Sequence, residues 1–225
     1  MTRPASDEAL ARREGIIAAA LELLDEDGFE RLSLRRLATH LGMHAPGLYW
    51  YIDSKQALTD LMAKAILDHG LAGVRGLAPG QQWDDWLVEL ACTVRRTLLV
   101  RRDGARVVAG AYLLKTQAIT PVIELSLEIL EGVGFERLVA LGGTMTLIRY
   151  AIGSVLDEQA SPLQGPDAKE RLHALPLPDI DVERWPRAAD AMRQVFEGKL
   201  RDRDRMFGWG ATLIVRGMRQ TSPSS

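Results

Sequence analysis

The sequence predicts an all-α protein, in which an N-terminal helix-turn-helix bundle of three or four helices precedes a larger helical domain. Apolar residues recur at spacings of three and four along most of the chain, and no stretch alternates as a half-buried strand does. A run of glycine and proline between residues 73 and 80 interrupts this periodicity. We therefore expect one domain over residues 1–70 and a second over residues 71–225.

The first expected helix has an apolar stripe and ends at a glycine. The stripe recurs with helical spacing, at Ile16, Ile17, Ala20, Leu21 and Leu24. Glycine takes the positive φ that commonly closes a helix at little cost, so the helix is expected to stop at Gly28.

Residues 32–55, LSLRRLATHLGMHAPGLYWYIDSK, have the pattern of a helix-turn-helix. Ser33 can cap a short helix, and its buried face is expected to contain Leu34, Leu37, Ala38 and Leu41. Gly42 allows a sharp turn, and Pro46 suits the first turn of a second short helix, where its missing N–H costs nothing.

The second short helix ends in three adjacent aromatic residues. Leu48 is expected to point inward, which leaves the other residues of this helix on the surface: Ala45, Gly47, Tyr49, Trp50 and Tyr51. Adjacent exposed aromatics are unusual, and contact with the sugars, phosphates and thymine methyl groups of a DNA major groove would account for them. The alternative is that this run simply packs in the core.

Ser54 can cap a fourth helix that ends near Gly70. Its buried face is expected to comprise Ala57, Leu58, Leu61, Met62, Ala65 and Ile66.

The second domain is expected to contain two long helices. A stripe over residues 83–98 predicts the first, and a shorter helix should open with Thr120 as its cap. The second, residues 138–156, holds small residues that would let another helix approach closely, either within the chain or across a dimer seam: Gly142, Gly143, Ala151 and Gly153.

Residues 158–186 hold five of the ten prolines and are expected to form a mobile loop. Two closing helices follow, over residues 187–199 and 202–220, and the second should bury Met206, Phe207, Leu213, Ile214 and Met218. We expect the tryptophans at 83, 86 and 209 in the core.

Composition narrows the class of protein. The net charge of −2 argues against indiscriminate nucleic-acid binding, yet residues 31–55 carry four basic residues and one acidic residue, a local net of +3. Cys92 is the single cysteine, which fits a reducing cytoplasm. No apolar run approaches the ~18 residues of a membrane span, and the charged N-terminus does not resemble a secretory signal.

Enzymatic chemistry finds no support in the sequence. His40 and His44 are spaced like a helical metal pair, but the expected turn lies between them and no acidic third ligand is nearby. Cys92 lies on an apolar stripe, where a thiol is ordinarily inert. Phosphate loops, paired catalytic carboxylates and serine elbows are absent, so we expect no enzyme, no metal and no cofactor.

These features together resemble the tetracycline-repressor (TetR) family. The segment PGLYWYIDSKQAL is similar to the family's recognition-helix signature. Trp83, the element from Arg102 to Ala105, and the stretch from Gly153 to Gln159 resemble the C-terminal domain of the tetracycline-repressor subgroup. The resemblance implies a DNA-binding N-terminal domain, a ligand-binding and dimerisation domain after it, and a homodimeric repressor on a palindromic double-stranded operator.

The resemblance also implies which residues contact DNA. Arg35 would approach a base edge and Lys55 a phosphate. The full implied set is Arg35, Arg36, His44, Ala45, Pro46, Gly47, Tyr49, Trp50, Tyr51 and Lys55. Ala45 and Gly47 are smaller and less polar than the residues of tetracycline repressors there, so the operator is expected to differ.

Positions that contact drug and magnesium in tetracycline repressors fall here on Leu71, Leu90, Val94, Val108, Ala111, Ser126 and Asp157. The subgroup uses a histidine on the metal where this chain has Val108, which cannot bind a hard cation. We therefore expect the effector to be an apolar or aromatic small molecule, not magnesium-tetracycline. Two alternatives stay open: these residues only fill the core, or the chain is a dimeric helical scaffold without an effector.

Overall fold

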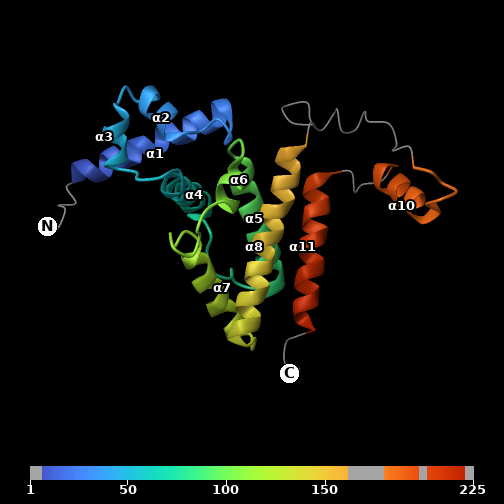
Figure 1. Ribbon diagram of the computed structural model, residues 1–225. Helices are drawn as coiled ribbons and strands as arrows, with labels where there is room; N and C mark the ends of the chain where they lie inside the picture. Colours follow the sequence, from blue (N-terminus) through green and yellow to red (C-terminus); the bar gives the residue numbers. More distant parts are fainter. Residues whose placement is uncertain (1–6, 162–179, 198–201, 221–225) are drawn as a thin grey trace.

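The computed structural model describes residues 7–161, 180–197 and 202–220, and within them the chain is helical with no strand (Figure 1). The all-α prediction is confirmed. The helices are α1 (Asp7–Asp27), α2 (Leu34–His40), α3 (Ala45–Tyr49), α4 (Lys55–Leu71), α5 (Trp83–Leu99), α6 (Gly104–Ala109), α7 (Thr120–Gly132), α8 (Arg137–Ala160), α10 (Pro186–Glu197) and α11 (Arg203–Arg219).

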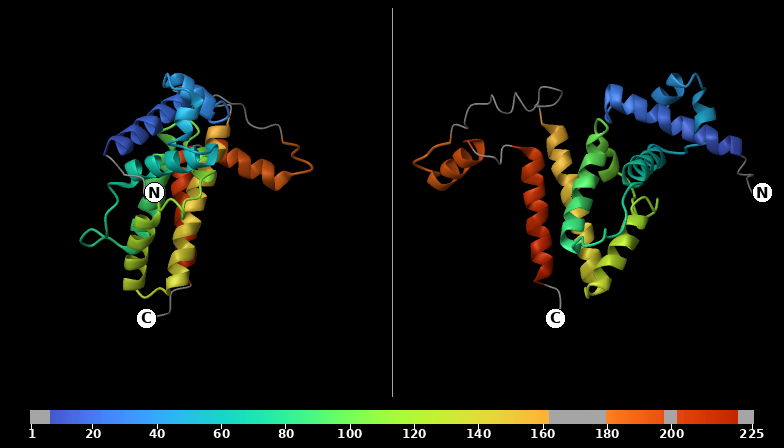
Figure 2. Two further views of the ribbon diagram at one scale, coloured as in Figure 1. Left: turned by 60° about the vertical axis from the view of Figure 1, so that its left-hand side comes forward. Right: turned by 180° about the vertical axis from the view of Figure 1, so that it is seen from behind.

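Helix α5 lies at the centre of the fold. It packs against α4, α6, α7, α8 and α11, so it joins the N-terminal helices to the C-terminal bundle. Its buried face contains Trp86, Leu87, Leu90, Ala91, Val94 and Leu98, as the periodicity predicts. Helices α1 to α3 lie together at one end of the molecule, and α10 stands away from the bundle in every view (Figures 1 and 2).

The helix ends in the N-terminal part confirm the predicted capping chemistry. Ser33 Oγ accepts from the backbone N–H of Arg36 at 3.2 Å, and Ser54 Oγ accepts from that of Ala57 at 3.0 Å. Gly28 and Gly42 take φ values of +80° and +62°. These local interactions set the angles at which α1, α2 and α4 meet.

Several boundaries and faces differ from the sequence-based expectation. Thr120 lies inside α7, because Ile119 is the N-cap and α7 has no side-chain cap. Helix α8 continues through residues 158–160 of the predicted loop, and residues 162–179 of that loop lie outside the described residues. In α4, Ala63 and Leu67 are fully buried whereas Ala57, Leu61 and Ala65 lie at the margin of the core.

The tryptophan at position 209 is not in the core. It is 55% exposed on α11, and Met206 and Leu213 of the predicted stripe are exposed as well. The face of α11 that packs inward consists of Phe207, Ala211, Val215 and Met218, which recur at four, four and three residues. Trp86 is buried and Trp83 packs at the edge of the core.

The small residues of α8 serve two different surfaces. A methyl group on Gly143 would lie 2.1 Å from the terminal carbon of Met218, so this glycine lets α11 approach within the same chain. Gly142 and Gly153 face open space. Helix α8 is long and apolar enough to cross a membrane, but it packs against α5, α7 and α11 as a core helix of the bundle.

The turn between α5 and α6 holds the C-terminal end of α1. Asp103 Oδ2 accepts from the backbone N–H of Phe29 at 2.8 Å, Arg101 forms an ion pair with Asp25, and the Arg102 guanidinium donates to the carbonyl of Glu26 at 2.8 Å. Three bonds from three consecutive residues of this turn thus fix the N-terminal helices to the bundle.

Helix α8 in turn holds that α5–α6 turn. The Gln159 side-chain amide donates to the carbonyls of Leu98 and Arg101 at 3.2 and 2.9 Å, and its oxygen accepts from the backbone N–H of Ala105 at 3.1 Å. On the other side of α6, Asp60 of α4 accepts from the N–H of Tyr112 at 2.9 Å. The α6 region is therefore hydrogen-bonded both to the end of α1 and to α4.

Arg95 is 5% exposed and joins α5, α8 and α11 through its guanidinium. It donates to Glu158 at 2.7 Å and to Asp204 at 2.5 Å, and it lies over the Phe207 ring at 5.4 Å. A buried cation is costly in free energy unless it is paired with anionic groups. Because Asp204 belongs to α11 and Glu158 to α8, these ion pairs hold α11 against the bundle.

Replacing Arg95 with Met is expected to lower the free energy of unfolding by about 1–3 kcal/mol. Glu158 loses its buried partner and keeps only its ion pair with Arg203, while the exposed Asp204 is solvated by water. Urea denaturation measures the change. Arg137→Met is the matched control, since its ion pair with Glu131 is exposed to solvent and its loss is expected to change stability much less. Equal effects of the two substitutions would contradict the role assigned to Arg95.

Candidate DNA interface and effector cavity

Packing under α2 and α3 determines which side chains reach the surface. Leu37 and Ala38 of α2, Leu48 of α3 and Ile52 after it are fully buried. This orientation leaves Tyr49 53% and Trp50 73% exposed, beside the exposed Pro46. Two large aromatic side chains therefore lie on the outer surface of the second short helix, as predicted.

The third aromatic residue differs from the prediction. Tyr51 is half-buried and packs against the core, because it lies three residues after Leu48 and so faces the same side. Ala45 and Gly47 are also half-buried, with Ala45 in contact with the core. The outer surface of α3 is therefore formed mainly by Pro46, Tyr49 and Trp50.

The basic residues around α2 and α3 are not equivalent. Arg35 is exposed and has no ion pair with any residue that the structure describes, whereas Arg36 forms an ion pair with Asp27. Lys55 is exposed at the start of α4, with its ammonium 4.9 Å from the centre of the Phe29 ring. His44 is exposed as the N-cap of α3. Arg35 and Lys55 thus carry the unneutralised charge on this surface.

The seven residues that the sequence predicts around an effector differ in burial. Leu71, Leu90, Val94, Val108 and Ser126 are buried and Ala111 is half-buried. The Ser126 hydroxyl donates to the carbonyl of Val122 at 2.7 Å within its own helix. Asp157 is exposed on α8. Apart from Asp157, the set therefore lies in an apolar interior.

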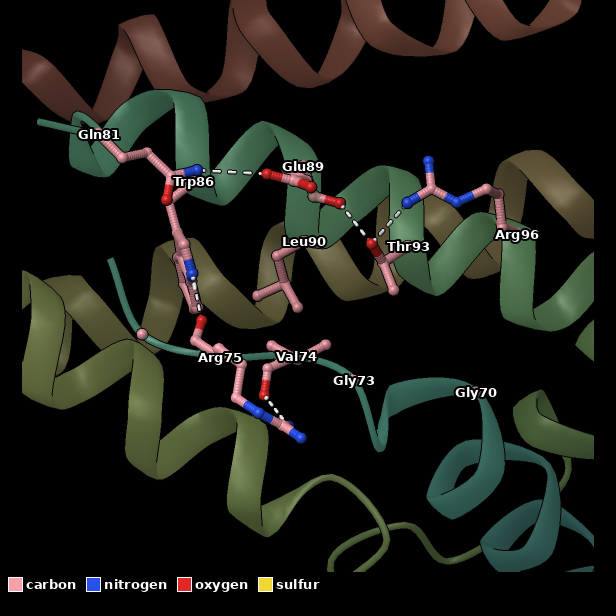
Figure 3. Close-up of a pocket in the computed structure, with 11 residues that line it drawn as sticks. Gly70, Gly73, Val74, Arg75, Gln81, Trp86, Glu89, Leu90, Thr93 and Arg96 are labelled. Atoms are coloured by element: carbon pink, nitrogen blue, oxygen red, sulfur yellow. Dashed lines mark hydrogen bonds between the residues drawn. The ribbon is translucent and has the colours of Figure 1, made fainter. Parts of the chain in front are cut away.

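A cavity of about 410 Å³ lies between α5 and the segment that follows α4 (Figure 3). Its lining is Gly70, Gly73, Val74, Arg75, Gly76, Gln81, Trp86, Glu89, Leu90, Thr93 and Arg96, so Leu90 alone comes from the predicted set. The sequence predicts only a domain boundary at residues 73–80. The available signal was the glycine content of this segment, since residues without side chains leave space beside a helix.

The described part of the chain offers little to a metal ion or to a nucleophilic thiol. It contains no cluster of three or more His, Cys, Asp and Glu side chains suited to a metal ion. Burial raises the pKa of the Cys92 thiol above its ordinary value, which keeps the thiol protonated and poorly nucleophilic at neutral pH.

Helices α2 and α3 form a short pair that is buried on one face and carries aromatic and basic side chains on the other. With a helical bundle behind it, this pair defines a helix-turn-helix DNA-binding protein. Residues 16–62 match the family model described as bacterial regulatory proteins, tetR family, and residues 76–222 match tetracyclin repressor-like, C-terminal domain. The chain belongs to the TetR family of DNA-binding transcription regulators, whose members are repressors that bind small-molecule ligands.

Relatives of known sequence and structure span nearly the whole chain. The class C tetracycline repressor protein of Escherichia coli is 36% identical over 218 residues, which cover 92% of this chain and 90% of that protein. A possible TetR family transcriptional regulator from Streptomyces coelicolor A3(2) has a TM-score of 0.75 at 28% identity and covers 93% of this chain and 99% of its own. A TetR variant from Acinetobacter baumannii AYE in complex with minocycline has a TM-score of 0.69 at 30% identity, with coverages of 94% and 98%.

Proposed function

We propose that this chain is a cytoplasmic, ligand-responsive repressor that binds a palindromic operator as a homodimer and has no enzymatic activity. Residues 1–70 would bind DNA, and residues 71–225 would bind the effector and dimerise. The observation that carries the proposal is the exposed surface of α2 and α3, where Arg35, Tyr49 and Trp50 stand over a fully buried Leu48. Such a surface fits the edges and backbone of a major groove.

The proposed homodimer rests on the outer faces of α8 and α11. Leu138, Met206, Trp209 and Leu213 are exposed there, and Gly142 and Gly153 of α8 face open space. A surface of exposed apolar side chains next to small residues suits close packing against another helix pair. A two-fold dimer would present two copies of α3 to successive major grooves.

The proposed coupling uses the two contacts on either side of α6. A ligand that moves α5 or α6 acts on α1 through Asp103 and on α4 through Asp60, because both carboxylates hold backbone N–H groups across the domains. The two half-sites of an operator lie about one helical turn of DNA apart, ~34–36 Å. A small change in the separation of the two α3 helices therefore prevents them from binding both half-sites at once. Release of DNA on effector binding is the expected direction, with a coupling free energy of about 1–3 kcal/mol.

Isothermal titration calorimetry is expected to show no magnesium-dependent binding of tetracycline to this chain. The position that would supply the metal-binding histidine is Val108, whose side chain has no lone pair, and it is fully buried. Minocycline in the related TetR structure makes a tetracycline the natural first compound to test. Tight binding that requires magnesium would overturn this prediction.

A gel-shift experiment with the DNA that flanks the gene for this chain tests the proposed function. The account predicts a discrete complex that survives excess unrelated DNA at moderate salt and contains two chains per site. A stable dimer without sequence preference would instead support the alternative, a helical scaffold protein.

A further inference from the structure

The cavity beside α5 borders the buried face of that helix. Glu89, Thr93 and Arg96 line it at helical spacing together with the buried Trp86 and Leu90, whereas Leu87, Val94 and Leu98 are not part of its lining. The opposite wall is the glycine-rich segment after α4, residues 73–76. Its volume of about 410 Å³ falls within the range of roughly 300–1,000 Å³ that small-molecule sites occupy.

The segment that forms the outer wall is fixed in place. The indole N–H of the buried Trp86 donates to the carbonyl of Arg75 at 2.7 Å. The Arg75 guanidinium turns back onto its own segment and donates to the carbonyls of Ala72 and Val74 at 2.6 and 2.9 Å. In Figure 3, Val74 and Leu90 lie in the middle of the cavity between the segment and α5. The wall is therefore preformed, and the middle of the cavity is apolar.

The charged groups of the cavity leave an excess of positive charge. Arg96 donates to the Thr93 hydroxyl at 2.8 Å and Arg75 to carbonyl oxygens, so both guanidinium groups have neutral partners and no ion pair among the described residues. Glu89 accepts from the amide of Gln81 at 3.2 Å. Gln81 lies at one end and Arg96 at the other, with Glu89 between them (Figure 3). An anionic group is thus favoured at the Arg96 end.

We propose that this cavity binds a small amphipathic organic anion, whose aromatic or alicyclic body lies on Leu90 and Val74 and whose carboxylate or sulfonate group pairs with Arg96. This compound would be the effector, so the inference rests on the proposed function and refines it. It replaces the purely apolar effector expected from the sequence, because Arg75 and Arg96 were not part of the predicted site.

A ligand in this cavity acts directly on α4. Gly70 lines the cavity in the last turn of α4, and a methyl group on it would lie 2.1 Å from Thr97 Cγ2 of α5. The two helices are therefore in backbone-to-side-chain contact at the cavity's edge. An occupant that touches both Gly70 and Arg96 changes how α4 sits on α5, and α4 continues from the helix-turn-helix through Ser54.

Fluorescence titration with 8-anilinonaphthalene-1-sulfonate, which has an aromatic body and one sulfonate, tests the proposal on the full chain. We expect saturable binding of one probe per chain, and Arg96→Gln is expected to weaken it about tenfold, the loss of a charge-assisted bond. N-phenyl-1-naphthylamine has the same body without the sulfonate, and its binding should be unchanged by Arg96→Gln. Arg187→Gln, which changes an exposed arginine on α10, is the matched control.

Equal binding of the sulfonate probe to the Arg96 and Arg187 variants would overturn the proposed site. Loss of the operator complex on addition of the probe to the unmodified chain, but not to Arg96→Gln at the same concentration, would support the effector role. A chain that binds the probe through Arg96 but forms no operator complex without it would overturn the proposed repressor function and leave the cavity as an anion site.

Discussion

Replacing both Arg35 and Tyr49 with alanine is expected to lower operator affinity at least about 100-fold while the dimer and the fold stay intact. Each base or backbone contact of this kind contributes about 1–3 kcal/mol. Because both chains of the proposed dimer lose two such contacts, the losses sum to at least ~4 kcal/mol, more than the ~2.7 kcal/mol that corresponds to two decades. Both side chains are exposed and pack little against the core, so their removal costs little stability. Fluorescence anisotropy at fixed salt measures the affinity, and sedimentation measures the dimer.

The matched control for that pair is Arg187→Ala with Trp185→Ala. This also removes one exposed arginine and one exposed aromatic residue, but from the region of α10, far from α2 and α3. The control is expected to bind the operator like the unmodified chain. If both double variants lose affinity equally, the surface of α2 and α3 is not the DNA interface.

Replacing Gly104 with alanine is expected to have the largest effect on stability. The added methyl group would lie 2.4 Å from the carbonyl oxygen of Leu98, and a backbone atom cannot rotate away as a side chain can. We expect the free energy of unfolding to fall by about 2–3 kcal/mol, as for an overpacked core position. Urea denaturation measures this change.

The same variant should bind the operator about tenfold more weakly under conditions where it is fully folded. Gly104 directly follows Asp103, whose carboxylate accepts from the Phe29 N–H. If the added methyl group displaces the turn, this hydrogen bond weakens. A hydrogen bond to a charged group contributes about 1.5–3 kcal/mol, and part of that free energy corresponds to about tenfold in affinity. Gly15→Ala is the control, because a methyl group there meets nothing within 4 Å and should stabilise α1 by about 0.5–1 kcal/mol. Normal operator binding by folded Gly104→Ala would argue against transmission through this turn.

The sequence predicted those features that depend on nearby residues. Caps at Ser33 and Ser54, the positive φ of Gly28 and the inward position of Leu48 each follow from interactions within one or two turns. The exposure of Tyr49 and Trp50 then follows from the same periodicity. This is why the helix-turn-helix could be predicted in detail before any relative was considered.

Features that depend on distant residues were missed. Gln159 belongs to a helix rather than a loop because its amide closes a turn almost 60 residues earlier in the chain. The buried Arg95 acquires partners from α8 and from α11, 109 residues further on, and periodicity cannot supply such pairings. The cavity is formed by a segment without regular structure, so no helical pattern marks it. The resemblance to tetracycline repressors indicates an apolar interior but not the arginines beside it.

Selection of bound duplexes from a random-sequence DNA library tests the central claim, that two copies of α3 bind a symmetric operator, most directly. The account predicts enrichment of a palindrome whose half-site centres lie about 10 base pairs apart, with a sequence different from tetracycline operators, and loss of that enrichment in the Arg35→Ala/Tyr49→Ala variant. Enrichment of a single asymmetric site, or no enrichment by a correctly folded dimer, would contradict it.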